Sequence, residues 1–186
     1  MLVELNCETD FVAKTDLFQQ VAGEIAAAAS KAKAADRLTL LSTEVRPGTT
    51  VEQLIEEAGN SLKEKLELGR YARFEGGYVD SYLHRSDAAL PPTLGVLVQL
   101  DKDNGEVAKD LAQQVAAMRP LYVTRDEGKP EQAIPKIVEG RVNSYFKDVV
   151  LVEQAFVKEQ KTTIKRVLAQ ADLTVTGFAR FQVGQA

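Results

Sequence analysis

The sequence predicts an α+β fold made of two similar subdomains that arose by an internal duplication. Segments in which apolar and polar residues alternate, as in strands, are mixed with segments in which apolar residues recur at helical spacing. The two kinds do not alternate strictly along the chain, which favours α+β over a parallel α/β sheet. Two distant parts of the chain also resemble each other. We therefore expect each subdomain to be a small antiparallel sheet packed with helices.

The first strand and the first long helix are expected near the amino terminus. Residues 2–5 (LVEL) have the composition of a short strand, and a helix is predicted over about residues 15–34. Asp16 can cap or charge the start of this helix. Four apolar residues at helical spacing are predicted to face the core: Leu17, Val21, Ile25 and Ala28.

A loop and a second helix are expected next. Residues 36–49 are predicted to form the loop, with Pro47-Gly48 as its turn signal. Thr49-Thr50 has the side chains of a helix cap, so the second helix is predicted to run from there to about Leu68.

The remaining elements mix strands and helices. Residues 70–84 alternate like strands around Gly76-Gly77, which allows a bulge or a close approach. The other expected elements are a strand from Leu94 to Leu100, a helix over residues 106–118 that Pro120 stops, a helix from about Glu131 or Pro135 to Phe146, a short helix from Thr162 to Ala171 and a final strand from Val175 to Val183.

The clearest part of the internal repeat links the two halves of the chain. Residues 2–14 (LVELNCETDFVAK) match residues 97–109 (LVQLDKDNGEVAK) at six positions. The next stretch, DLFQQVA, differs from its counterpart DLAQQVA at a single residue. Further along, residues 49–55 (TTVEQLI) resemble residues 162–168 (TTIKRVL). These similarities predict two subdomains, residues 1–76 and residues 77–186, with the final strand available to both sheets.

At one loop the two copies of the repeat differ, which indicates residues that the fold itself does not require. Residues 7–11 (CETDF) lie opposite residues 102–106 (KDNGE), so the same connection works without a phenylalanine. Phe11 is therefore a candidate for an exposed apolar anchor beside the charges of Glu8 and Asp10, of the kind that fills a partner's pocket. The alternative is that Phe11 holds the first helix against its own sheet.

Composition excludes several classes of protein. The chain has 186 residues and a net charge of −4, which disfavours non-specific nucleic-acid binding. A single cysteine, Cys7, rules out an internal disulfide and fits a reducing compartment. No apolar run approaches the roughly 20 residues that span a bilayer, and the start of the sequence lacks the pattern of a signal peptide. We expect a cytoplasmic protein that contacts neither membrane nor nucleic acid, with an organelle matrix as the alternative compartment.

The sequence gives little indication of a catalytic site. One histidine, His84, and one cysteine, Cys7, do not make a zinc site, so no metal and no cofactor is expected. Neither GxxxxGK[ST] nor GxGxxG, the common phosphate-binding patterns, occurs. A Cys7/His84 nucleophile pair is the one route to an enzyme, and a small α+β enzyme is kept as an alternative.

Several segments resemble the elongation factor Ts family. LVELNCETDFVAK followed by FQQVA is similar to that family's signature, and the tetrapeptide TDFV within it is highly specific. The similarity continues in order through EKLELGRYARFEG, LGVLVQL, AKDLAQQVAAMRPLYVTRDE and TGFARFQVG, and covers nearly the whole chain. It implies a duplicated, two-subdomain core.

The resemblance implies a guanine-nucleotide exchange factor for the GTPase elongation factor Tu, which it would meet in GDP-bound and nucleotide-free forms. In the family, the aspartate and phenylalanine of TDFV wedge between two helices of the GTPase, dislodge Mg²⁺ and disturb the phosphate loop. The matching residues here are Thr9, Asp10, Phe11 and Val12. Because exchange makes and breaks no bond, no enzyme active site is expected.

Further partner contacts are implied by the same resemblance. Leu94 and Gly95 match a pair at the start of a strand that touches the partner, and the second subdomain is expected to dock on the third domain of elongation factor Tu. Gln114 occupies the place of a histidine that reaches the partner in many members. Gln114 can still donate and accept hydrogen bonds but cannot become a cation. Gln20 has the same repeat position, so a structural role for Gln114 is the alternative.

The family's amino-terminal helical domain and the helical hairpin found in many members have no counterpart in this sequence, either because the protein lost them or because the sequence is an incomplete or spliced version of a longer chain. Only Glu127 separates the segment YVTRD from GKPEQ, where that hairpin would stand. A protein without these parts could bind the GTPase yet release GDP poorly, and this binder is the main alternative to an exchange factor.

Overall fold

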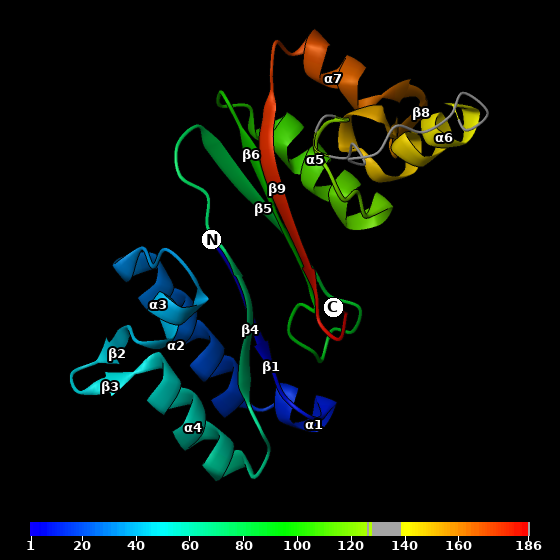
Figure 1. The fold of residues 1–186 in the computed structure, drawn as a ribbon. Helices are drawn as coiled ribbons and strands as arrows, with labels where there is room; N and C mark the ends of the chain where they lie inside the picture. Colours follow the sequence, from blue (N-terminus) through cyan, green and yellow to red (C-terminus); the bar gives the residue numbers. More distant parts are fainter. Residues whose placement is uncertain (126, 128–138, 186) are drawn as a thin grey trace. The chain divides into compact units, whose positions relative to one another are not determined.

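A computed structural model describes residues 1–125, 127 and 139–185, without the side chains of residues 139–141. Its elements in chain order (Figure 1) are β1 (Leu2–Asn6), α1 (Asp10–Ala13), α2 (Asp16–Ala32), α3 (Arg37–Leu41), β2 (Glu44–Arg46), β3 (Thr49–Thr50), α4 (Val51–Leu62), β4 (Glu67–Ala72), β5 (Tyr78–His84), β6 (Leu94–Leu100), α5 (Gly105–Met118), α6 (Glu139–Val149), the 3₁₀ helix η2 (Leu151–Glu153), β7 (Ala155–Phe156), β8 (Glu159–Thr163), α7 (Ile164–Gln170) and β9 (Val175–Gln182).

The strands form small sheets, which confirms the predicted α+β class. β1 pairs with β4, β2 with β3 and β7 with β8, each pair antiparallel. A three-stranded sheet has the order β5-β6-β9. Helices and strands follow one another without the regular alternation that a parallel sheet requires.

The chain divides into two compact units. Unit 1 comprises Met1–Phe74, Leu83–Gly95 and Phe181–Ala186, and unit 2 comprises Glu75–Tyr82 and Val96–Arg180. Each unit contains its own buried apolar residues, such as Ile25 in unit 1 and Leu111 in unit 2. The division into subdomains 1–76 and 77–186 stays a prediction.

Helix α2 presents a slightly different face to the core of unit 1 than predicted. Val21, Ile25 and Ala28 are buried as expected, but Leu17 is 38% exposed and Phe18 is the buried residue of the first turn. The cap residue also differs from the predicted one. The Thr15 side chain, rather than that of Asp16, accepts a hydrogen bond from the Phe18 amide. Phe18 lies about one turn before Val21 and shares the buried face of the helix.

The predicted loop at residues 36–49 was wrong, because it contains α3 and β2. The Asp36 side chain caps α3 by accepting a 2.7 Å hydrogen bond from the Thr39 amide. Leu40 of this helix is fully buried. Too few residues separate the caps for a helical period to be recognised in the sequence.

Helix α4 begins where predicted but ends earlier. Thr50 and Gln53 form a reciprocal capping box, and Lys63 adopts a left-handed conformation that ends the helix after Leu62. Leu68, the predicted last helical residue, lies instead in β4, where it pairs with Leu5 of β1 and is buried.

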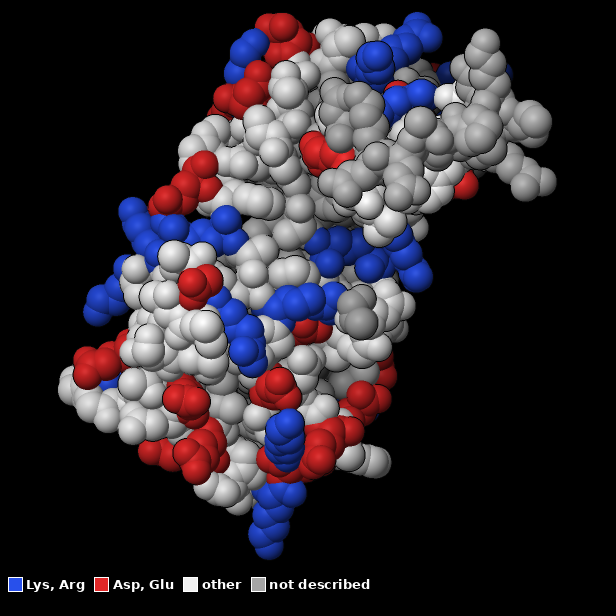
Figure 2. Space-filling model, viewed as in Figure 1, with Lys and Arg blue, Asp and Glu red and all other residues white. Residues whose placement is uncertain are grey.

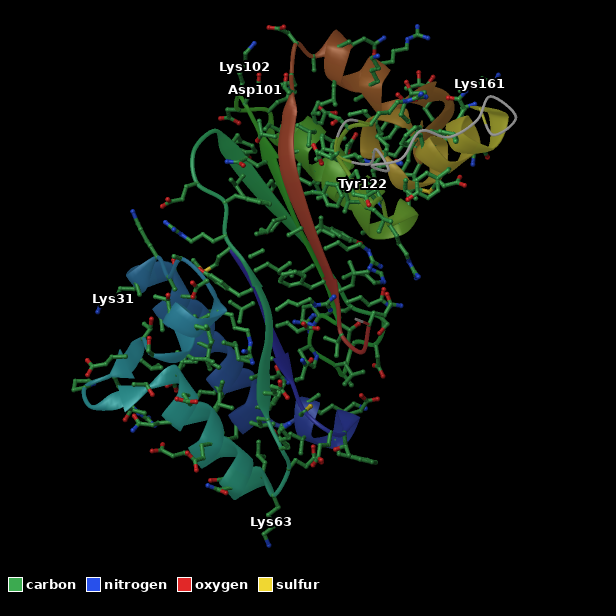
Figure 3. All side chains as sticks on the ribbon, viewed as in Figure 1. Lys31, Lys63, Asp101, Lys102, Tyr122 and Lys161 are labelled. Atoms are coloured by element: carbon green, nitrogen blue, oxygen red, sulfur yellow. The ribbon has the colours of Figure 1, made fainter. Side chains whose placement is uncertain are left out.

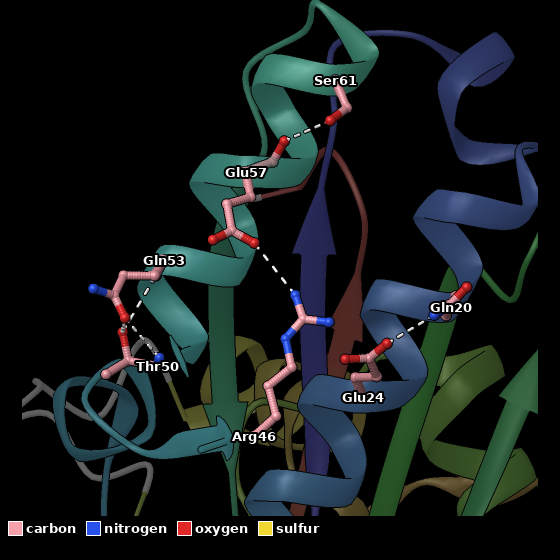
Figure 4. A network of polar contacts seen from close by, with 7 residues as sticks. All are labelled: Gln20, Glu24, Arg46, Thr50, Gln53, Glu57 and Ser61. Atoms are coloured by element: carbon pink, nitrogen blue, oxygen red, sulfur yellow. Dashed lines mark hydrogen bonds and ion pairs between the residues drawn. The ribbon is translucent and has the colours of Figure 1, made fainter. Parts of the chain in front are cut away.

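Polar contacts accompany the packing of α2 and α4 (Figure 4). Arg46 of β2 contacts Glu57 of α4 at 3.3 Å, and Gln20 donates to Glu24 along α2 at 2.9 Å. Exposed pairs of this kind contribute only about 0–1 kcal/mol. Burial of the apolar faces therefore dominates the packing of these two helices.

The second half of the chain contains the predicted β6, α5, α7 and β9, but η2, β7 and β8 were not predicted, and Thr162, the expected start of the last helix, lies in β8. Helix α5 and strand β6 lie where expected, and α7 is capped by Thr163, the repeat counterpart of Thr50. The starts predicted at Glu131 or Pro135 lie outside the described residues. The described helix α6 runs past the predicted end, Phe146, to Val149.

No helix in residues 1–125 and 139–185 combines the length and the apolar character that crossing a membrane requires.

Candidate partner-binding site

Residues Thr9–Val12, here called the TDFV turn, form the start of helix α1. Thr9 is the cap residue, and its side-chain oxygen accepts a hydrogen bond from the Val12 amide at 3.4 Å. Asp10 lies in the first turn, where a negative charge is favoured by the helix dipole. The local sequence thus stabilises a short helix directly after strand β1.

Phe11 of this turn points into solvent. Its side chain is 85% exposed, the largest value among the large hydrophobic residues that the structure describes, whereas the neighbouring Val12 is 7% exposed and belongs to the core of unit 1. Successive residues of a helix point in directions about 100° apart, so burying Val12 turns Phe11 outward. The alternative in which Phe11 holds the first helix against its own sheet is thereby excluded.

Glu64 holds the TDFV turn in place, a role that sequence reasoning missed. Its Oε2 accepts hydrogen bonds from the amides of Glu8 (3.1 Å) and Thr9 (3.0 Å), and its Oε1 accepts one from the Thr9 hydroxyl. In return, Glu8 Oε2 accepts a hydrogen bond from the Lys65 amide at 3.1 Å. No local motif marks these contacts, because more than fifty residues separate the partners.

The end of α4 determines where Glu64 lies. Lys63 is left-handed, with φ of 57°, and the Glu64 amide donates back to the Gly59 carbonyl at 3.2 Å. A Cβ on Gly59 would lie 2.9 Å from the Glu64 carbonyl oxygen, so only glycine permits this approach. Figure 3 shows the Lys63 side chain extending away from the protein at this turn.

The surroundings of Phe11 are rich in carboxylates. Glu8 and Asp10, its near neighbours in the chain, are both exposed. Figure 2 shows acidic side chains gathered over the part of unit 1 that contains α1 and α4. An exposed aromatic ring in such surroundings suits an apolar pocket with basic groups at its edge.

Leu94 and Gly95 begin strand β6. Leu94 is half-buried, and Gly95 is buried. A Cβ on Gly95 would lie 2.6 Å from Leu2 Cδ1 and 3.2 Å from Leu83 Cδ2. Packing within unit 1 therefore explains the glycine, while Leu94 keeps some accessible surface.

Gln114 has no accessible surface in this structure. Its Nε2 donates to the Ala155 carbonyl at 2.9 Å and to Gln154 Oε1 at 3.3 Å, and its Oε1 accepts a hydrogen bond from the Val157 amide at 2.7 Å. A buried amide satisfied in this way has a structural role. Gln20, at the same repeat position, is exposed on α2. These contacts agree with the structural alternative for Gln114, and the partner contact stays a prediction.

The thiol of Cys7 is not activated as a nucleophile would be. The Cys7 thiol donates to the Thr9 carbonyl at 3.3 Å, and burial, together with the nearby charge of Glu64, raises the pKa of this thiol. A raised pKa disfavours the thiolate that a nucleophile needs. His84 is exposed at the end of β5. Within the described residues, no three His, Cys, Asp or Glu side chains gather as metal ligands would.

An α+β protein with a firmly held, solvent-exposed aromatic turn has the features of a protein-binding factor. The model of a family described as "Elongation factor TS" matches residues 8–127 and 124–185. Proteins named elongation factor Ts from Thermobifida fusca, Streptomyces coelicolor and Mycobacterium tuberculosis are 53%, 46% and 49% identical; the matches cover 100%, 99% and 100% of this chain and 74%, 73% and 75% of those proteins. The chain belongs to the elongation factor Ts family, whose members are translation elongation factors.

Proposed function

We propose that this protein is a guanine-nucleotide exchange factor that promotes GDP release from elongation factor Tu during translation. The observation that carries the proposal is the exposure of Phe11, at 85%, on a short helix whose next residue is buried. An apolar ring held out into water has no stabilising role within unit 1. It does suit insertion into a partner's pocket.

The proposed mechanism is displacement at the partner's nucleotide site. A bound nucleoside diphosphate is held by backbone amides at a helix N-terminus and, through its phosphates, by Mg²⁺. Insertion of Asp10 and Phe11 between two helices of the GTPase would shift the phosphate loop and dislodge the metal. Because several charge-assisted hydrogen bonds depend on the same geometry, a small shift weakens all of them together.

Exchange of this kind is thermodynamic coupling rather than bond chemistry. If the factor binds the nucleotide-free GTPase more tightly than the GDP-bound form, GDP must weaken binding of the factor by the same ratio. The protein therefore needs no catalytic residues of its own, and the raised pKa of Cys7 agrees with this. We place its action in the bacterial cytoplasm, where translation occurs.

Leu94 is proposed as a secondary contact, with Gly95 as the residue that lets the strand start pack closely. The half-buried Leu94 offers less apolar surface than Phe11. Its contribution to binding should accordingly be smaller than that of the TDFV turn.

The test is stopped-flow release of a fluorescent GDP from elongation factor Tu by the wild-type protein and by Phe11→Ala. We expect strong acceleration by the wild type and loss of most of it in the variant. Phe11→Ala should change the free energy of unfolding by no more than about 0.5 kcal/mol, because the ring is exposed. Leu38→Ala is the matched control, since Leu38 is 72% exposed on α3 and should keep full activity.

The outcomes separate the proposal from its alternative. Acceleration that disappears in Phe11→Ala but not in Leu38→Ala supports exchange through the TDFV turn. Binding of the GTPase without acceleration of GDP release would establish a binder with little exchange activity. A large fall in the melting temperature of Phe11→Ala would contradict the role given to this side chain.

A further inference from the structure

Within the TDFV turn only Val12 is buried in the core of unit 1, so the further contacts that order the turn come from residues outside it. Phe11 and Asp10 are both exposed, and α1 is only four residues long. A helix this short is not stable by itself. The amides of Glu8 and Thr9, which directly precede the helix, also have no partner within it.

Glu64 supplies the missing partner. Its carboxylate accepts hydrogen bonds from the Glu8 amide (3.1 Å), the Thr9 amide (3.0 Å) and the Thr9 hydroxyl. The Glu8 carboxylate accepts a hydrogen bond from the Lys65 amide in the opposite direction, at 3.1 Å. Two carboxylates thus join the start of α1 to the end of α4, and hydrogen bonds to charged acceptors are the stronger kind.

The end of α4 is itself well held. The left-handed Lys63 and the hydrogen bond from the Glu64 amide to the Gly59 carbonyl fix the turn that carries Glu64. Gly59 is required there, because a Cβ would lie 2.9 Å from the Glu64 carbonyl oxygen. The position of Phe11 therefore depends both on the burial of Val12 and on residues about fifty positions further along the chain.

We propose that Glu64 is the positioning residue of the exchange reaction: it holds the TDFV turn in the conformation that inserts Phe11, without contacting the nucleotide site itself. This inference rests on the proposed function. Its physical basis is preorganisation, because a turn that must be ordered during insertion loses part of its binding energy to that ordering. A displacement of about 1 Å at such a contact can lower a rate a hundredfold.

The first test compares Glu64→Ala with Glu56→Ala, the same change at an exposed glutamate of the preceding helix α4. The maximal rate of GDP release from elongation factor Tu, at saturating factor, should fall at least about tenfold for Glu64→Ala and stay unchanged for Glu56→Ala. Glu64→Gln should be intermediate, because its amide keeps one acceptor oxygen. Equal activity of Glu64→Ala and Glu56→Ala would overturn the inference.

A double-mutant cycle then asks whether Glu64 acts through Phe11. If it does, Glu64→Ala should cause little further loss in a Phe11→Ala background, although it is damaging alone. Losses that add in full would mean that Glu64 acts separately, and would overturn the inference.

Amide hydrogen exchange of the isolated protein distinguishes failure of this inference from failure of the proposed function. The Glu8 and Thr9 amides should exchange at least about tenfold faster in Glu64→Ala, while amides in the buried turns of α2 keep their protection. If wild-type protein fails to accelerate GDP release, the proposed function is contradicted. Hydrogen exchange at the Glu8 and Thr9 amides then still decides whether Glu64 holds the TDFV turn. Unchanged protection there would overturn it.

Discussion

Glu4 is a carboxylate in the interior of unit 1, and Arg70 neutralises it. Arg70 Nε and Nη2 each donate to the carboxylate at 2.8 Å, and the Arg70 amide adds a third hydrogen bond at 3.0 Å. Burial disfavours the charged carboxylate, but the hydrogen bonds and the charge of Arg70 outweigh it. The pKa of Glu4 is therefore held below its ordinary value of 4.5.

This lowered pKa predicts an acid-dependent loss of stability. The ion pair contributes fully above pH 4.5, and its contribution is lost as the pH falls through the lower pKa of the folded state. At neutral pH, we expect Glu4→Gln to lower the free energy of unfolding by about 1–3 kcal/mol, less than for a fully buried pair because Arg70 is partly exposed. The difference from wild type should narrow as the pH falls below 4.5.

Urea unfolding over this pH range measures the effect. Glu67→Gln is the control, because Glu67 forms only exposed pairs with Arg37 and Lys65 and should cost at most about 1 kcal/mol. A difference in the free energy of unfolding between Glu4→Gln and wild type that stays constant down to acid pH would contradict the lowered pKa of Glu4.

At the scale of the element, two glycines within helices have opposite environments. A Cβ on Gly23 of α2 would meet no atom within 4 Å, whereas one on Gly59 of α4 would lie 2.9 Å from the Glu64 carbonyl oxygen. A glycine within a helix ordinarily lowers the free energy of unfolding by about 0.5–1 kcal/mol relative to alanine. Gly59 is tolerated because the turn that ends α4 requires it.

The two glycines predict opposite effects of the same substitution. Gly23→Ala should raise the free energy of unfolding by about 0.5–1 kcal/mol, because it removes backbone entropy from the unfolded chain without a clash. Gly59→Ala should lower it and should also speed hydrogen exchange at Thr9 by displacing Glu64. Thermal unfolding of the two variants checks the sign, and stabilisation by Gly59→Ala would contradict the close approach described here.

Helix limits illustrate what a local pattern can decide. The Thr50 and Thr163 caps could be recognised from the repeat alone, because a threonine before an apolar run has a local physical meaning. The end of α4 could not, since the Leu66 and Leu68 side chains suit a helix as well as a strand. Pairing of β4 with β1 decided in favour of the strand.

At the scale of the whole molecule, residues far apart in sequence complete unit 1. Arg70 Nη2 donates to the Gln182 carbonyl at 2.7 Å, and its guanidinium lies 5.0 Å from the centre of the Phe181 ring. The Val183 amide donates to the Thr93 carbonyl at 2.9 Å. The last residues of the chain are therefore part of the unit that contains the first strand.

These contacts predict the effect of removing the end of the chain. A protein ending at Arg180 should lose about 2–3 kcal/mol of unfolding free energy, because Arg70 loses a hydrogen bond and its ring contact. A protein ending at Gly184 keeps both contacts and serves as the control. Urea midpoints of the two shortened proteins check this; equal midpoints would show that the Arg70 contacts with Gln182 and Phe181 contribute little.

The sequence by itself determined the α+β class, most helices and strands, the duplicated pattern and the TDFV segment as the candidate site. These features depend on periodicity, caps and short motifs, which act between residues near one another in the chain. Only the tertiary structure decided that Phe11 is exposed, that Gln114 is buried and that Glu64 holds the TDFV turn. Exposure and hydrogen bonding across more than fifty residues depend on how elements pack, and no local pattern encodes that packing.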